Sequence, residues 1–142
     1  TDDPRSSHGH GLRLNKRAIH AYAQSMMEKY DVRATSDSQS VRELSGGNQQ
    51  KVIIARELES GPSVLVMAHP TRGLDIGATS FVHDQMIAAR ARGVGILLIS
   101  ADFDEILEMS DRIVVCFEGR IMGEFSGSKP PINEISLAMT GK

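Results

Sequence analysis

The chain has 142 residues, 40% hydrophobic and 24% charged, which is typical of a globular domain rather than of a disordered or fibrous protein. Its formal charge of −2 argues against a polyanion-binding surface, so nucleic acid is not expected as a partner. The single cysteine, Cys116, excludes an internal disulfide, and its apolar neighbourhood RIVVCF predicts a buried thiol. No apolar run approaches the roughly 20 residues of a membrane-spanning helix, so membrane association is expected only through a partner.

The N-terminal stretch TDDPRSSHGHG is polar and contains proline and glycine, which predicts a flexible segment over residues 1–11. His8 and His10 could hold a metal ion there, but no other ligand lies nearby in sequence, so a solvated segment is the simpler interpretation. A packing helix is predicted next, with Asn15 as its N-cap and one apolar stripe. The stripe contains Ile19, Tyr22, Ala23, Met26 and Tyr30.

The stretch LSGGNQQKVIIAREL, residues 44–58, places two glycines at the start of a helix predicted to run to about residue 59. The N–H groups of a first helical turn have no partner inside the helix, and the helix dipole adds partial positive charge there. Gly46 and Gly47 would let an anion approach the backbone, and Ser45 would add a hydroxyl donor, which together make a phosphate seat without lysine. Ordinary capping by Ser45, with the glycines as a turn, accounts for the same residues.

Strands and helices alternate over the rest of the chain. Continuous apolar runs predict strands covered on both faces at residues 63–70 and 94–101. Helices are predicted over residues 79–93 and 102–110, followed by two strands joined at Glu118 and Gly119 and by a last short helix. This order indicates an α/β fold with a mainly parallel sheet.

Four stretches carry a family resemblance, and they follow one another in the family's order over residues 12–126. LSGGNQQKVIIAREL resembles the signature motif of ATP-binding cassette (ABC) proteins, and its NQQK continuation is similar to the variant in importers for simple sugars and nucleosides. The stretch SVLVMAHPTRGLD resembles the Walker B strand and the D-loop. The stretch GILLISADFDEI resembles the switch-histidine strand, and the stretch SDRIVVCFEGRIMGE resembles the closing strands. The chain is therefore similar to the C-terminal part of the second, degenerate nucleotide-binding domain of such an importer's ATP-binding subunit.

This resemblance implies a partial P-loop NTPase core of the ABC ATPase type, with a mainly parallel sheet, plus a helical signature subdomain. The implied organisation is a flexible segment at 1–11, the helical subdomain at 12–60, half of the RecA-like ATPase core at 61–126 and a C-terminal tail or helix at 127–142. In phosphate-loop folds the strand leading into the loop lies centrally. Without it, the GILLIS and RIVVCF strands lack their shared neighbour, so they are expected to rearrange, to pair with another copy or to be marginally stable.

The resemblance also implies how the glycine-rich helix start is used. In the family two cassettes face each other head to tail, and each ATP lies between the phosphate loop of one and the signature helix of the other. The SGG of the motif would touch the γ-phosphate of an ATP that the partner cassette holds together with Mg²⁺. The next two residues would cap or flank that contact, and the aspartate of the GLD turn would lie at the facing interface. The implied binding residues are Ser45, Gly46, Gly47, Asn48, Gln49 and Asp75.

Every position that hydrolysis requires is absent or replaced. The class uses a phosphate loop with its lysine, a strand-end aspartate for Mg²⁺, a glutamate that positions water and a γ-phosphate-sensing histidine. The chain has no GxxxxGKS or GxxxxGKT pattern, its Walker B-like strand ends in Ala68–His69, and Ala101 takes the switch-histidine position. His69 has the pKa range of a general base, yet nothing is positioned for it to act on. We predict no catalytic residue, no metal ligand and no ATPase activity of this chain alone; whether it counts as an enzyme stays open.

The leading interpretation is a non-catalytic part of an importer's ATPase subunit, peripheral on the cytoplasmic face of the cell membrane. Its implied partners are a complete cassette, the transmembrane permease and, indirectly, a substrate-binding protein.

A soluble ABC-type ATPase module without a transporter is the alternative, although neither charge nor heptads support one. A small enzyme using Asp102, Asp104 and Glu105 is a weaker third hypothesis, because early acids are typical of a helix start. The motif does not distinguish sugar from nucleoside, although MAHPTRGLD leans to the nucleoside-like branch.

Overall fold

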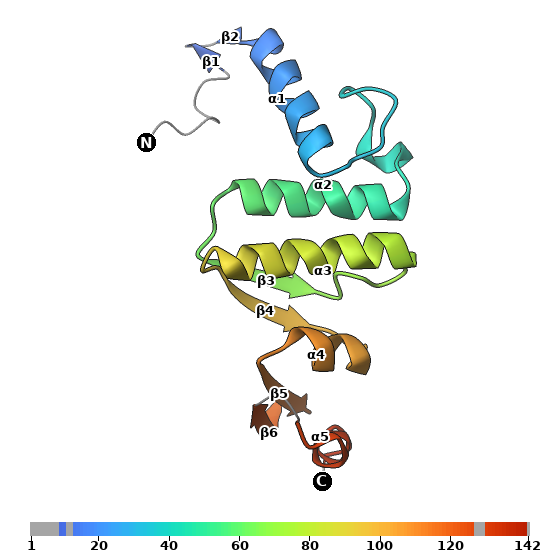
Figure 1. Cartoon of the computed structure of the whole chain (residues 1–142), viewed down its shortest axis with the longest axis vertical. Helices are drawn as coiled ribbons and strands as arrows, with labels where there is room; N and C mark the ends of the chain where they lie inside the picture. Colours follow the sequence, from blue (N-terminus) through green and yellow to red (C-terminus); the bar gives the residue numbers. More distant parts are fainter. Residues whose placement is uncertain (1–8, 11–12, 127–129, 142) are drawn as a thin grey trace. The chain divides into compact units, whose positions relative to one another are not determined.

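The computed structural model describes residues 9–10, 13–126 and 130–141, which belong to two compact units. The first unit comprises Thr1–Leu65 and Pro70–Ile96, and the second comprises Val66–His69 and Leu97–Lys142. Figure 1 labels the elements along the chain. Most of the predicted flexible segment, including His8, lies outside the described residues. Its described part, β1 (Gly9–His10), pairs antiparallel with β2 (Arg13–Leu14).

Helix α1 (Lys16–Lys29) begins where the sequence predicts, because the Asn15 side chain accepts a hydrogen bond from the Ala18 N–H at 3.1 Å. Its apolar stripe is only half-buried, and no residue within the helix is fully buried. The residue that ends the helix, Tyr30, is 3% exposed and donates from its hydroxyl to Glu59 Oε1 at 2.7 Å. Burial, reinforced by this hydrogen bond, raises the pKa of Tyr30.

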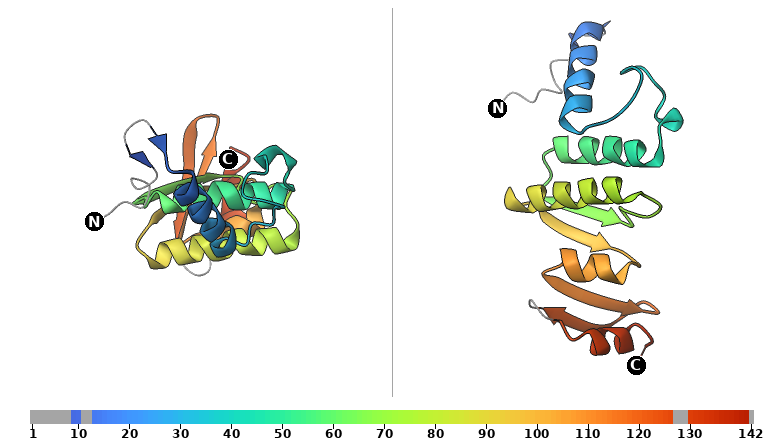
Figure 2. Two further views of the ribbon diagram at one scale, coloured as in Figure 1. Left: turned by 90° about the horizontal axis from the view of Figure 1, so that it is seen from above. Right: turned by 45° about the vertical axis from the view of Figure 1, so that its right-hand side comes forward.

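Helix α2 (Gly46–Glu59) follows a short 3-10 turn, η2 (Val41–Glu43), and ends before Ser60 as predicted. Its buried face packs beside α3 (Ile76–Ala91), and both views in Figure 2 show the two helices side by side. Helix α3 begins earlier than the predicted residue 79, because the Asp75 carboxylate caps it by accepting from the Ala78 N–H at 2.8 Å. The buried residues of the two helices are Ile54, Ala55, Leu58, Ala78, Val82, Met86 and Ala89.

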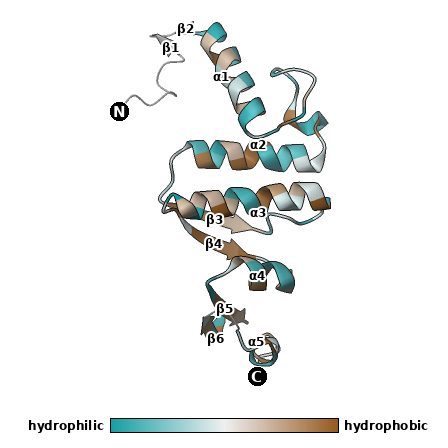
Figure 3. Cartoon of the chain, in the orientation of Figure 1, coloured by the Kyte–Doolittle hydropathy of each residue, from teal (hydrophilic) through white to brown (hydrophobic). Residues whose placement is uncertain are grey.

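Strands β3 (Val64–Ala68) and β4 (Gly95–Ile99) form a two-stranded sheet. The Gly95 N–H donates to the Ser63 carbonyl at 2.9 Å and the His69 N–H donates to the Ile99 carbonyl at 2.7 Å, so the strands start and finish together and are parallel. The prediction that both strands are covered on both faces is wrong for the described residues. Alternate side chains stay exposed, among them Val66 at 61% and Leu97 at 54%, and Figure 3 shows how apolar these strands are.

The second unit contains α4 (Phe103–Met109), the antiparallel hairpin of β5 (Arg112–Phe117) and β6 (Arg120–Ser126), and α5 (Ile132–Ala138). Both residues of the hairpin turn have positive φ, 46° at Glu118 and 76° at Gly119, which matches the twist of the flanking strands. One face of the hairpin packs against α5. The core of this unit is formed by Ile113, Val115, Ile135 and Ala138, with Phe103, Ile106, Leu107 and Phe125 packed against it.

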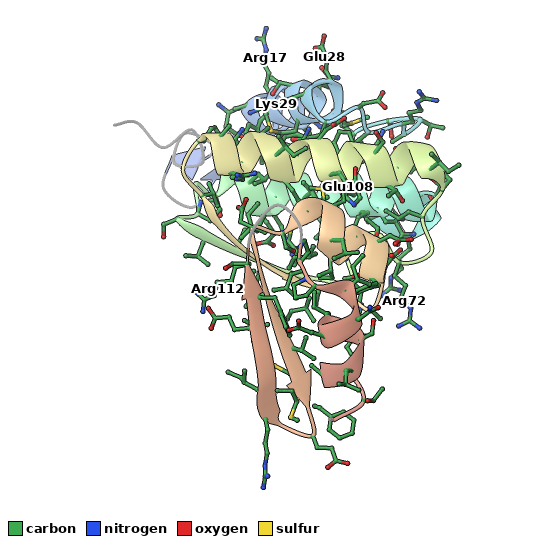
Figure 4. The ribbon with its side chains drawn as sticks, turned by 60° about the horizontal axis from the view of Figure 1, so that its bottom comes forward. Arg17, Glu28, Lys29, Arg72, Glu108 and Arg112 are labelled. Carbon is green, nitrogen blue, oxygen red and sulfur yellow. The ribbon has the colours of Figure 1, made fainter. Side chains whose placement is uncertain are left out.

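Cys116 is exposed, which corrects the prediction of a buried thiol. The inward side chains of β5 are Ile113 and Val115, so alternation turns the next residue to the opposite face. The apolar run RIVVCF suggested cover on both faces, but among the described residues only one face of β5 is buried. Arg112 also lies on the open face, where Figure 4 shows it pointing away from α5 and where it pairs with Glu124 at 2.7 Å.

The described strands form three separate two-stranded sheets. Within the described part of the chain, β4 pairs only with β3 and β5 pairs only with β6, so no strand is shared between β4 and β5. Among the described residues these two strands therefore have no common neighbour. Each therefore presents an edge of backbone N–H and C=O groups to which another strand can hydrogen bond.

Candidate functional site

The first N–H groups of α2 have no hydrogen-bond partner within the helix. Ser45, the N-cap, has an extended backbone (φ −61°, ψ 155°), and its side chain makes no capping bond. The first hydrogen bond of the helix runs from the Gln49 N–H to the Ser45 carbonyl at 2.9 Å. The N–H groups of Gly46, Gly47 and Asn48 precede that bond and have no acceptor within the helix. They add to the positive end of the helix dipole, which favours an anion there.

The two glycines of the motif are there for different reasons. A Cβ added at Gly47 would lie 3.0 Å from the Ala78 Cβ, so this glycine permits the close approach of α2 and α3. A Cβ added at Gly46 would meet nothing within 4 Å. Neither glycine has the positive φ that would itself demand glycine. The packing of the chain therefore explains the glycine at position 47. At position 46 an added Cβ would meet no other atom of the chain within 4 Å.

The amide side chains after the glycines bind the chain itself. Asn48 Oδ1 accepts from the Arg33 N–H at 2.7 Å, and Asn48 Nδ2 donates to Ser45 Oγ at 2.9 Å. Gln49 Nε2 donates to the Leu44 carbonyl at 2.8 Å. Both side chains thus hold the 31–45 segment against the start of α2.

Lys51 completes this attachment, and sequence reasoning missed it. Its ammonium donates to the Asp31 backbone carbonyl at 2.8 Å and to Asp31 Oδ2 at 2.6 Å, and lies 4.8 Å from the centre of the Phe81 ring. The hydrogen bond from Lys51 lowers the pKa of Asp31. Asp31 has φ 48°, and its side chain is 61% exposed against 12% for Lys51. The only signal in the sequence was the lysine at the end of NQQK.

The D-loop residues lie next to the signature helix. The contact between Gly47 and Ala78 brings the start of α3 beside the start of α2. Asp75, predicted to lie at an interface, caps α3 with its carboxylate and is exposed. The following residue, Ile76, is 91% exposed, an unusual environment for a large aliphatic side chain. The structure therefore brings Gly47, at the start of α2, next to Ala78, three residues after Asp75.

The residues that directly follow β3 and β4 are not carboxylates. His69 follows β3, is exposed and has φ 49°, and Ala101 is an exposed residue after β4. The acid that follows Ala101 in the sequence is Asp102. Its carboxylate accepts from the N–H groups of Asp104 and Glu105 at 3.0 and 3.2 Å, which identifies it as the cap of α4. In the part of the chain that the structure describes, no group of three His, Cys, Asp or Glu side chains could hold a metal. These residues do not fit Mg²⁺, which prefers carboxylate oxygens and water.

A cavity of about 610 Å³ opens within the first unit, between α1, the segment after it and α2. Its wall is mostly apolar, because the half-buried stripe of α1 faces it. Met26, which belongs to that stripe, and its neighbour Met27 line the cavity with flexible side chains. The lining residues are Tyr22, Ala23, Met26, Met27, Val32, Ala34, Ser36, Asp37, Gln39, Val41, Leu44, Val52, Ala55, Arg56, Glu57, Glu59 and Ser60.

Known proteins similar to this chain are ATP-binding proteins of importers, while no family model matches it. A nucleoside import ATP-binding protein of Lactococcus lactis is 44% identical over 138 residues, 97% of this chain and 27% of the relative. A guanosine import ATP-binding protein of Bacillus subtilis is 44% identical over 90% of this chain and 25% of its own length. A ribose import ATP-binding protein of Lacticaseibacillus paracasei is 40% identical over 93% and 26%. The chain thus spans about a quarter of the length of these relatives.

Solved structures of ABC transporter cassettes share the fold. An ATP-binding cassette of an ABC transporter superposes with a TM-score of 0.67 at 25% identity, over 93% of this chain and 50% of that one. A nucleotide-free cassette gives 0.68 at 26% identity, over 88% and 47%. These matches confirm the predicted α/β fold of the P-loop NTPase type. By these relatives and this shared fold, the chain belongs to the family of ATP-binding proteins of ABC importers.

Proposed function

We propose that this chain supplies the signature motif to an ATP held by a partner cassette and performs no hydrolysis itself. The observation that carries this proposal is the start of α2, where the first N–H groups have no partner within the helix and a Cβ added at Gly46 would meet nothing within 4 Å. The chain's own packing does not use that space. A triphosphate oxygen can approach it closely, and the helix dipole favours the negative charge.

The neighbouring D-loop supports a partner cassette as the source of the nucleotide. Asp75 and Ile76 stand beside the signature helix, and a side chain as apolar and exposed as Ile76 is expected to be covered in an assembly. We propose that both residues lie at the interface between two cassettes. In this arrangement Ser45 and the two glycines touch the γ-phosphate, and Asp75 holds the start of α3 in place.

The replaced strand ends support a non-catalytic role. Ala68 and Ala101 have no side-chain oxygen or nitrogen that could bind a metal ion, and His69 is an exposed histidine. In hydrolysis of this class the metal ion and a carboxylate stabilise and position the reacting groups. We propose that Mg²⁺ is held by the partner cassette together with the phosphate loop.

The wider assembly follows from the relatives, whose names describe nucleoside, guanosine and ribose import. We propose that this chain works on the cytoplasmic face of the membrane, bound to the permease of a nucleoside or simple-sugar importer that a substrate-binding protein supplies. No helix of the described residues has the length and apolar content to cross a bilayer. The contact with the membrane is therefore proposed to run through the permease.

Sedimentation of this chain with a complete cassette from an importer ATP-binding protein tests the proposal. Association is expected with a non-hydrolysable ATP analogue and not with ADP, because the motif contacts the γ-phosphate. Gly46→Glu should abolish the association, since a carboxylate would occupy the open space and repel the anion. Equal association with ADP, or association that survives Gly46→Glu, would overturn the proposal.

A further inference from the structure

The Asn48 side chain lies between the turn after α1 and the start of α2. Its Oδ1 accepts from the Arg33 N–H at 2.7 Å, and its Nδ2 donates to Ser45 Oγ at 2.9 Å. A backbone N–H can only donate, so the end of the amide group that faces Arg33 must be the oxygen. The two ends of an Asn amide are otherwise easily confused, but here the Arg33 backbone fixes which is which. The Asn48 nitrogen therefore faces Ser45.

This orientation decides what the Ser45 hydroxyl does. A hydroxyl has one proton and can accept two hydrogen bonds. Ser45 accepts one from Asn48 and makes no capping bond to its helix, although serine at this position commonly does. The Ser45 proton must point away from the Asn48 N–H group. Since Ser45 is exposed, that proton is available to an acceptor outside the chain.

We propose that Asn48 is a positioning residue, which holds the Ser45 hydroxyl as a donor toward an acceptor-only group, the phosphate oxygen of the partner's nucleotide. This inference rests on the proposed function and adds a role for Asn48, which acts through Ser45 rather than by touching the nucleotide. It also links the turn at Arg33 to the binding site, since losing the Arg33 contact frees the amide group to rotate. A rotated amide would place its oxygen toward Ser45 and draw the hydroxyl proton inward.

Gln49 offers a matched control. Its Nε2 donates to the Leu44 carbonyl at 2.8 Å, so it holds the same segment with the same kind of hydrogen bond and does not contact Ser45. Replacing Gln49 by alanine removes an equivalent attachment. It leaves the Ser45 hydroxyl with its Asn48 donor.

A double-mutant cycle on the ATP-analogue-dependent association with a complete cassette tests the inference. Ser45→Ala and Asn48→Ala should each weaken the association about tenfold, the scale of one hydrogen bond to a charged group. The double variant should be no weaker than the worse single variant. Gln49→Ala combined with Ser45→Ala should instead give the product of its two single effects. If the double variant instead loses the product of the two single losses, the positioning role is overturned while the proposed function stays intact. If Ser45→Ala has no effect on the association, both are overturned.

Asn48→Asp guards against a variant that fails to fold. The aspartate keeps an acceptor for the Arg33 N–H, but it presents no donor to Ser45 and would accept the Ser45 proton instead. It should weaken the association more in a chain that retains Ser45 than in a chain that already carries Ser45→Ala. Equal weakening in both backgrounds would also contradict the positioning role.

Discussion

Gly46 and Gly47 are neighbours with different functions. Gly47 faces Ala78 across the contact of α2 and α3, whereas Gly46 faces open space. A pattern of two glycines in a motif does not separate these functions, because it carries no information on what each residue faces. Packing separates them, and the difference is testable by substituting one glycine at a time.

Gly47→Ala should lower the free energy of unfolding by about 1 kcal/mol, because its Cβ would lie 3.0 Å from the Ala78 Cβ and force the helices apart. Gly46→Ala should leave it nearly unchanged. Denaturant unfolding of the two variants measures both effects. Gly47→Ala should cost less in a chain that already carries Ala78→Gly, and an equal loss in both backgrounds would show that the helix contact is not its cause.

Lys51→Met should destabilise the first unit by about 1 kcal/mol, since it keeps the apolar stem near Phe81 and removes the bonds to Asp31. Thermal unfolding followed by circular dichroism provides the measurement. Arg17→Met is the control, because Figure 4 shows Arg17 pointing away from the chain. A smaller loss for Lys51→Met than for Arg17→Met would contradict the attachment described here.

At the scale of elements, the end of α1 is tied to the end of α2 through one carboxylate. Glu59 Oε1 accepts from Lys29 Nζ at 2.6 Å and from the Tyr30 hydroxyl at 2.7 Å. Burial alone would raise the pKa of Glu59, but the hydrogen bonds from Lys29 and Tyr30 outweigh it and lower that pKa. Folding therefore favours the charged form of Glu59, so the stability that its hydrogen bonds contribute depends on pH.

The stabilisation from Glu59 should be complete above its unfolded-state pKa of about 4.3 and should be lost as pH falls through the lower folded-state pKa. Glu59→Gln removes this titration, so its unfolding midpoint should fall less between pH 6 and pH 3 than that of the unaltered chain. Denaturant midpoints at the two pH values test this. Equal falls in both chains would exclude Glu59 as a contributor.

The element boundaries show what the sequence could predict. Asn15 marked the start of α1, and the SGP stretch marked the end of α2, because caps and breakers act locally. The cap at Asp75 was overlooked, so α3 was predicted to begin too late. The predictions that both faces of β3 and β4 are covered and that Cys116 is buried were wrong. An apolar run shows which side chains can be buried, but it does not show whether another element is present to cover them. The bonds from Asn48 to Arg33 and from Lys51 to Asp31 join residues that are 15 and 20 positions apart, so no local pattern revealed them.

At the scale of the whole molecule, the described strands leave apolar faces and backbone edges uncovered. Val66, Leu97 and Ile99 are 61%, 54% and 47% exposed, and β4 and β5 each pair on one edge only among the described residues. Such strands associate readily with other strands. The isolated chain should therefore self-associate as its concentration rises, or unfold at low denaturant with weak cooperativity.

Sedimentation velocity over a range of concentrations tests this expectation, and Leu97→Lys should reduce the association by placing a charge on the open face. Ile87→Lys is the control, since Ile87 is 54% exposed but belongs to a helix. A monomer that unfolds in one sharp transition at every concentration would contradict the expectation.

The central claim is that the start of α2 completes a nucleotide site on another cassette. Cross-linking tests it most directly: Ser45→Cys in this chain, in a background where Cys116→Ser removes the other thiol, is paired with a single cysteine in the phosphate loop of a complete cassette. The account predicts a cross-link that forms with ATP and fails with ADP. A cross-link independent of the γ-phosphate, or Mg²⁺-dependent ATP hydrolysis by this chain alone, would contradict it.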